Sequence, residues 1–337
     1  MNLLPKPKKI TEKGGQLLLC HSMYIVISKE ISDNGIYAAK RLQEAIRQET
    51  GLLLRLSVGE TRDGDFSLRI TETLSEQAYE ITINENGVQI LGGDGAGVLY
   101  GVETFCQILQ QYGGALPCMQ IMDAPDMPNR GYYFDQTRGR ILKLEELKKI
   151  ADRMSLYKLN QLQLYVEHTY LFRDFSEMWR DQTPITAEEI RELDSYCRER
   201  HIELVPSLAS FGHLCTLLST KTYGDLCEME DSWKEPFSFW NRMRYHTINV
   251  SDGRSLPLIK KMIAEYMQLF SSDKFNICAD ETFCLGKYKS KELAKECGIH
   301  RLYIDYVKEL AQFLVENGKI PMFWGDIIWN SPELMKE

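Results

Sequence analysis

The pattern of apolar and polar positions predicts a mixed α/β region over roughly the first 125 residues. Short alternating runs predict strands at 23–28, 52–58, 66–70 and 79–83, and longer periodic runs predict helices at 34–51 and 95–114. Asn86-Gly87 lies between two alternating runs, which is the signature of a tight β-hairpin. The proline-bearing stretch 116–131 then indicates a linker, so we place a domain boundary near residue 125.

Beyond this boundary the pattern becomes a regular alternation of strands and helices. Strands are predicted at 131–137, 161–167, 202–210, 275–281 and 321–329, with helices at 144–159, 186–201, 256–270 and 300–318. Thr186 and Glu189 form a capping box at the start of one of these helices. Near-continuous apolar strands that alternate with helices are typical of parallel βα units, as in a doubly wound sheet or a (β/α)₈ barrel. No glycine-rich phosphate loop follows a strand, which disfavours nucleotide binding.

Polar residues end each of the predicted parallel strands. They are Asp135 with Arg138, Glu167-His168, Gly212-His213, Asp280-Glu281 and Asp326. In a barrel the carboxyl ends of all strands surround one mouth, and catalytic residues sit there. The adjacent acids Asp280 and Glu281 can reach one cleft from different angles because the chain turns away from the strand at this point. The alternative is that one acid pairs with an arginine while the other is solvated.

Composition and charge exclude several classes of partner and location. The 337 residues are 44% hydrophobic and carry a net charge of −8, which argues against nucleic acid or an anionic membrane as the main partner. No signal peptide and no membrane-spanning apolar run is visible, and the nine cysteines form no C-x-x-C pair, so we expect a cytoplasmic protein with free thiols. Histidines and cysteines lack convincing ligand spacing, so we predict no metal.

Several segments resemble glycoside hydrolase family 20, the β-N-acetylhexosaminidases. The segments are RGYYFDQTR (130–138), YKLNQLQLYVEH (157–168), IELVPSLASFGH (202–213), FNICADE (275–281) and, earlier, GAGVLYGVETFCQIL (95–109). They follow the order of the family's first barrel strands and of the last helix of its small N-terminal domain. The resemblance implies an N-terminal α+β domain at 1–125 and a partial (β/α)₈ barrel at 126–337, and the variants VEHTY and DETFCLGK are closest to the cytosolic branch with hexosaminidase D. Only about five of eight barrel strands are present, so the chain is expected to be a fragment, or the missing units come from elsewhere.

The resemblance also implies the chemistry of the adjacent acids. Glu281 is expected to protonate the leaving oxygen and then to activate water, while Asp280 holds the 2-acetamido group and stabilises the positively charged cyclic intermediate. The acetamido oxygen of the substrate is the nucleophile, which is the exception to the usual two-carboxylate scheme of glycosidases. No cofactor is implied.

Five further residues are implied to bind substrate. Arg138 is expected to grip the 3- and 4-hydroxyls, and Trp324 to form an aromatic wall of the acetamido pocket. His213 is expected behind the acids, Asp326 at a sugar hydroxyl, and Glu167 near the second strand end. The implied partners are β-linked N-acetylglucosamine or N-acetylgalactosamine glycans and glycoconjugates, with a homodimer as a possible assembly. The alternatives are another barrel glycosidase for acetamido sugars and a non-catalytic sugar-binding fragment.

Overall fold

The computed structural model describes residues 1–31, 33–236 and 238–329, which cluster into two compact units. Unit 1 contains Met1–Gly131, Lys148–Gln161 and Tyr196–Ile202, and unit 2 contains Tyr132–Leu147, Leu162–Ser195 and the chain from Glu203 onward. No described helix is both long enough and apolar enough to span a bilayer.

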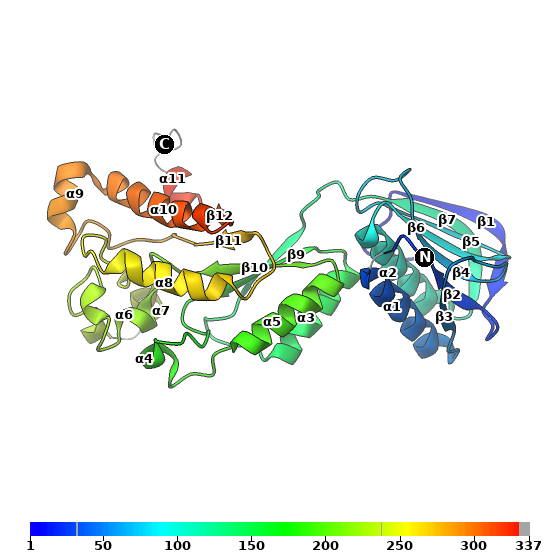
Figure 1. Ribbon diagram of the computed structural model, residues 1–337, viewed down its shortest axis with the longest axis horizontal. Helices are drawn as coiled ribbons and strands as arrows, with labels where there is room; N and C mark the ends of the chain where they lie inside the picture. Colours follow the sequence, from blue (N-terminus) through cyan, green and yellow to red (C-terminus); the bar gives the residue numbers. More distant parts are fainter. Residues whose placement is uncertain (32, 237, 330–337) are drawn as a thin grey trace. The chain divides into compact units, whose positions relative to one another are not determined.

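Unit 1 is built on a seven-stranded sheet. Its elements are β1 (Lys9–Leu18), β2 (Tyr24–Ile27), α1 (Asp33–Thr50), β3 (Arg55–Val58), β4 (Phe66–Ile70), β5 (Tyr79–Asn84), β6 (Gly87–Gly92), α2 (Gly95–Tyr112) and β7 (Ala115–Asp123). The strand order is β1-β7-β5-β6-β4-β2-β3 (Figure 1). The predicted hairpin is confirmed, since β5 and β6 pair antiparallel with Asn84 opposite Gly87.

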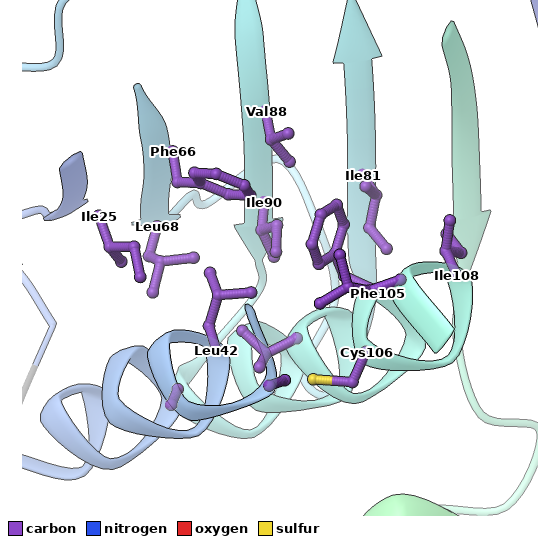
Figure 2. Packing of buried hydrophobic residues seen from close by; sticks show 14 of the residues in the cluster. Ile25, Leu42, Phe66, Leu68, Ile81, Val88, Ile90, Phe105, Cys106 and Ile108 are labelled. Atoms are coloured by element: carbon purple, nitrogen blue, oxygen red, sulfur yellow. The ribbon is translucent and has the colours of Figure 1, made fainter. Parts of the chain in front are cut away.

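The core of unit 1 lies between this sheet and the helices α1 and α2. Figure 2 shows strand residues such as Phe66 and Ile81 directed at helix residues such as Leu42 and Phe105. The rings of Phe66 and Phe105 meet edge to face with their centroids 5.4 Å apart, a favoured aromatic geometry. Helix α2 begins where the Asp94 carboxylate accepts from the Gly97 amide at 2.7 Å, which is a side-chain cap.

The prediction of a linker over 116–131 is wrong for its first half. Residues Ala115–Asp123 form β7, which pairs antiparallel with both β1 and β5. Pro117 is opposite Gln16 in the β1 pairing, at the place where the register shifts. The alternation of buried and exposed residues outweighs the single proline, because a proline beside an irregular pairing costs few ladder hydrogen bonds.

The chain from Gly131 onward contains a five-stranded sheet in the order β12-β11-β10-β9-β8 (Figure 1). The elements are β8 (Gly131–Asp135), α3 (Leu144–Leu156), β9 (Gln161–Val166), α4 (Ser176–Trp179), α5 (Ala187–Glu199), β10 (Glu203–Leu208), α6 (Cys215–Leu218), α7 (Phe239–Arg244), α8 (Ser255–Met267), β11 (Lys274–Asn276), α9 (Lys291–Cys297), α10 (Ile299–Glu316), β12 (Ile320–Met322) and α11 (Asp326–Trp329). The pairings of β11 with β10 and β12 are parallel. The α/β fold class with a parallel sheet after an α+β domain is confirmed.

Beyond residue 125, the structure confirms the predicted capping box but shortens two of the predicted strands. The capping box exists, since the Thr186 amide donates to Glu189 Oε2 at 2.9 Å and the Glu189 amide donates to Thr186 Oγ1 at 3.2 Å. The strands predicted at 275–281 and 321–329 end earlier, at Asn276 and Met322. Both extend into loops that carry polar site residues, and Asp326 begins helix α11 instead of finishing a strand.

Candidate active site

The two adjacent acids lie on a tightly turned loop after β11. Cys278, Ala279 and Glu281 have φ angles of +58°, +61° and +47°, a left-handed conformation that residues with a Cβ rarely adopt. The loop is held by Asn276 Oδ1, which accepts from the Cys278 amide at 2.9 Å, and by the hydroxyl of Tyr303, which donates to the Ala279 carbonyl at 3.1 Å. Strained backbone of this kind persists where surrounding contacts enforce it, often at functional sites.

His213 connects the two acids from the end of β10. Its Nε2 lies 3.2 Å from Glu281 Oε2 and 3.5 Å from Asp280 Oδ2. Burial lowers the pKa of His213, but its hydrogen bond to Asp280 and the charges on Asp280, Glu167 and Glu281 outweigh burial and raise it above the usual value. The imidazole is 3% exposed, whereas the carboxylates of Asp280 and Glu281 are 25% and 35% exposed, so the acids remain open to a ligand.

Gly212 allows the β10 and β11 loops to come this close. A Cβ at position 212 would lie 2.6 Å from the main-chain oxygen of Asp280, a distance that a methyl group cannot occupy. The glycine therefore sets the separation of His213 from the acids.

Arg138 lies at the end of β8 and is fixed by Asp135. Its Nε donates to Asp135 Oδ2 at 2.6 Å, and the amides of Thr137 and Arg138 both donate to Asp135 Oδ1 at 2.9 Å. The guanidinium also lies over the ring of Tyr165, 5.1 Å from its centroid. Arg138 is 30% exposed, so it presents an oriented cation to the mouth of the sheet.

Glu167 is buried, and each of its carboxylate oxygens accepts a hydrogen bond from a protein partner. Its Oε1 accepts from the hydroxyl of Tyr165 at 2.9 Å and its Oε2 from Arg242 Nη2 at 2.8 Å. The side chain is 3% exposed. This geometry supports a role in positioning neighbours, and direct sugar contact by Glu167 stays a prediction. Sequence reasoning missed Arg242, because α7 lies in a long excursion after β10 and carries no strand-end signal.

Trp324 and Asp326 follow β12. The Trp324 ring is 40% exposed and meets the Tyr133 ring edge to face at 5.1 Å, while the Tyr133 hydroxyl and Ser207 Oγ lie 3.0 Å apart. Tyr133 was also missed, since it reads as an ordinary strand residue. Burial raises the pKa of Asp326, and the charge of Asp280 raises it further. All seven residues predicted from the sequence belong to unit 2.

The ligand atoms of His213, Asp280 and Glu281 lie within 4.8 Å of one another, the spacing of a candidate cation site. A set of one imidazole and two carboxylates is compatible with several divalent metals. The same arrangement is also what proton transfer requires, since two partly exposed carboxyls share one basic nitrogen. That no metal is used stays a prediction.

Comparisons with known proteins agree with this arrangement. Residues 1–124 match glycosyl hydrolase family 20, domain 2, and residues 127–337 match the catalytic domain of the same family. The fold and the acid pair at the strand ends fit the class of glycoside hydrolases to which the matched family belongs. The chain belongs to glycoside hydrolase family 20. The position of the domain boundary near residue 125 stays a prediction.

Individual relatives are distant and longer. A β-hexosaminidase of Porphyromonas gingivalis is 23% identical over 97% of this chain and 46% of its own length, and one of Akkermansia muciniphila is 30% identical over 50% of this chain and 36% of its own. The structure of Flavobacterium johnsoniae chitobiase superposes with a TM-score of 0.84 at 21% identity, over 96% of this chain and 52% of that one. The chain thus spans less than half the length of these two curated relatives.

Proposed function

We propose that the full-length protein containing this chain is an exo-acting β-N-acetylhexosaminidase, which removes terminal β-linked N-acetylglucosamine or N-acetylgalactosamine. The observation that carries this proposal is the Asp280–Glu281 pair, held by His213 at the end of β10. At the end of β8 in the same sheet, Arg138 is oriented by Asp135. The Vibrio harveyi exo-β-N-acetylglucosaminidase, with a TM-score of 0.77 and 21% identity, was solved in complex with N-acetylglucosamine.

The reaction proceeds in two steps on this geometry. In the first, the acetamido oxygen of the substrate attacks the anomeric carbon, the bond to the leaving oxygen breaks, and Glu281 gives that oxygen its proton. In the second, water attacks the anomeric carbon, Glu281 accepts the proton of the water, and the cyclic intermediate opens to the free sugar. Asp280 orients the amide and stabilises the positive charge as it develops, an electrostatic effect realised mainly in the transition state.

The remaining residues hold the terminal sugar. Arg138 grips the 3- and 4-hydroxyls, because its planar fork is already fixed by Asp135 and needs little further ordering. The exposed ring of Trp324 covers the acetamido methyl, and Asp326 reaches a hydroxyl. Glu167 acts from behind through Tyr165 and Arg242.

The decisive measurement is the requirement for the 2-acetamido group. On the full-length protein, a nitrophenyl N-acetyl-β-hexosaminide should be hydrolysed and its 2-hydroxy counterpart should be nearly inert. Asp280→Asn should reduce turnover on the order of 10²–10³-fold, as expected for loss of one preorganised electrostatic partner. Comparable rates on the two substrates would show that the protein supplies its own nucleophile, and the proposal would fail.

Three finer proposals follow from the sequence. The VEHTY and DETFCLGK variants support the cytosolic branch with hexosaminidase D, and with it a cytoplasmic location. The structure records no disulfide among its described residues, which suits a reducing compartment. The five strands of the parallel sheet support a barrel completed by further units that this chain does not include.

A further inference from the structure

A cavity of about 360 Å³ is lined entirely by residues of unit 1, whereas the residues assigned to the hydrolytic reaction belong to unit 2. This volume is within the range of small-molecule sites, which begins at about 300 Å³. Much of the lining is apolar, and it is supplied by Pro5, Ala124, Pro125 and Met127 together with the rings of Tyr79 and Tyr100. The cavity is therefore suited to a ligand with an apolar body.

Lys158 is a buried cation that lines this cavity. The residue is 6% exposed, and its Nζ is buried without a hydrogen-bond partner among the described residues. Nζ lies 5.5 Å from the centroid of the Tyr79 ring, which also lines the cavity, so the amine is placed at the cavity wall. The face of the ring attracts an ammonium but gives its three N–H groups no oxygen acceptor. A buried polar group without a partner is rare and calls for an acceptor from a ligand or a water.

The two carboxylates of the lining are engaged with other donors. Asp123 Oδ2 accepts from the Tyr79 hydroxyl at 2.9 Å, and its Oδ1 accepts from the Lys8 amide at 3.3 Å. Asp126 pairs with Lys8 Nζ at 2.7 Å. Burial lowers the pKa of Lys158 to about 8, although the charge of Asp123 raises it, so the protonated amine still predominates at pH 7. Lys158 is thus a cation that no described carboxylate binds directly.

Arg130 adds a second positive charge to the cavity. Its guanidinium donates to the carbonyls of Lys158, Met127 and Pro128 and to the Tyr100 hydroxyl, at 2.7 to 3.1 Å. It makes no ion pair with a described residue, so no carboxylate in contact neutralises it. The charged residues of the lining are Lys6, Lys8, Arg130 and Lys158 against Asp123 and Asp126. The cavity therefore favours an anion, although the whole chain carries −8.

We propose that this cavity binds a small organic acid, with its carboxylate at Lys158 Nζ and its apolar body against the surrounding apolar residues and tyrosine rings. One free ammonium suits a single negative charge, and a charge-assisted hydrogen bond to it satisfies the buried amine. Arg130 contributes charge, since its donors are directed at carbonyl groups. The inference is independent of the proposed function, because no residue assigned to the hydrolytic reaction lines the cavity.

The test measures binding to the full-length protein by ligand-observed NMR titration, with phenylacetate and hexanoate as acids and phenylacetamide as the neutral analogue. At least one acid should bind, and phenylacetamide should bind on the order of 10-fold more weakly than phenylacetate, as for loss of one charge-assisted hydrogen bond. Lys158→Met, which keeps the length of the side chain, should weaken the acids by a similar factor and leave phenylacetamide unchanged. Lys6→Met removes an exposed lysine of the same lining and is the matched control, which should change binding by less than about twofold.

Three outcomes would overturn the inference. They are binding of neither acid, equal binding of phenylacetate and phenylacetamide, and equal weakening by Lys6→Met and Lys158→Met, which would reduce the effect to general electrostatics. None of them bears on hydrolysis, so the proposed function stands or fails separately.

A measurement on the wild-type protein decides the inference if Lys158→Met does not fold. With methyl-labelled methionine, the Met127 signal should shift and saturate with the acid that binds, because Met127 lines the cavity. The signal of Met267, a buried residue of unit 2, should stay in place. A titration that leaves Met127 unmoved would contradict the site.

Discussion

The strand ends of the parallel sheet divide into two halves with opposite electrostatic character. At β8 and β9 each carboxylate has its own arginine, since Asp135 pairs with Arg138 and Glu167 with Arg242. At β10 and β11, two carboxylates share the single imidazole of His213. The structure records no arginine or lysine paired with Asp280 or Glu281 among the described residues.

The difference indicates that the first half binds the sugar and the second half transfers protons. A carboxylate with a fixed cation keeps one geometry, which suits the binding and orienting of a neutral sugar. The two acids of the second half share one imidazole and have no fixed cation beside them, which suits proton transfer to and from a bound substrate. The backbone follows the same division, since the left-handed residues Cys278, Ala279 and Glu281 all lie in the second half.

The largest effect on turnover is expected when the proton donor of the second half is removed. In the full-length protein, Glu281→Gln should slow substrates with poor leaving groups by roughly 10²–10⁴-fold, because general acid catalysis matters most when the leaving oxygen needs a proton. Nitrophenyl substrates should lose much less. Steady-state kinetics on a chitobioside and a nitrophenyl substrate make the comparison, and equal losses would assign the acid role to another residue.

A smaller effect is expected from breaking a pair in the first half. Arg242→Met leaves Glu167 buried beside Tyr165 without its cation, which should cost about 3 kcal/mol of unfolding free energy, near the lower end for a buried pair because Arg242 is 17% exposed. The double variant with Glu167→Gln should recover most of that loss in a denaturant titration.

The control for this pair is Arg254→Met. Arg254 also makes ion pairs, with Asp225 and Asp252, but its side chain is 62% exposed. The loss of unfolding free energy there should be much smaller than for Arg242→Met, because solvent screens an exposed ion pair. A cost equal to that of Arg242→Met would show that burial of the Glu167 pair is not what matters.

The smallest expected effect is on the pH dependence of stability, to which His213 and His168 should contribute with opposite sign. The pKa of His213 is raised in the folded chain, so its contribution to stability is complete below about pH 6.5 and is lost as pH rises through the folded value. The pKa of His168 is lowered to about 4, so the chain loses stability as pH falls from 6.5 toward 4.

Denaturant titrations from pH 5.5 to 9 test both signs. The unfolding free energy of wild type minus that of His213→Gln should be largest at pH 5.5 and shrink by about 1 kcal/mol toward pH 9, as for one charge-assisted hydrogen bond. For His168→Gln the difference should grow with pH. Parallel profiles for the two variants would contradict the assignment.

Much of this arrangement was predictable from sequence, because strand ends in parallel sheets are marked by polar residues after apolar runs. That rule found Asp135, Arg138, Glu167, His213 and the acid pair. It missed Arg242, whose role depends on a contact 75 residues away along the chain. It also misread 116–123 as a linker, because prolines near a boundary resemble a linker until the partner strands β1 and β5 are known.

The close approach at Gly212 limits how this site can vary. The loops after β10 and β11 touch at Gly212, where only a hydrogen atom fits. The main chain therefore sets the distance between His213 and the two acids. Side chains around the site can change and alter which sugar is bound. A larger residue at position 212 would require both loops to move. Substitutions at this position are therefore expected to be less tolerated than substitutions of the side chains around the site.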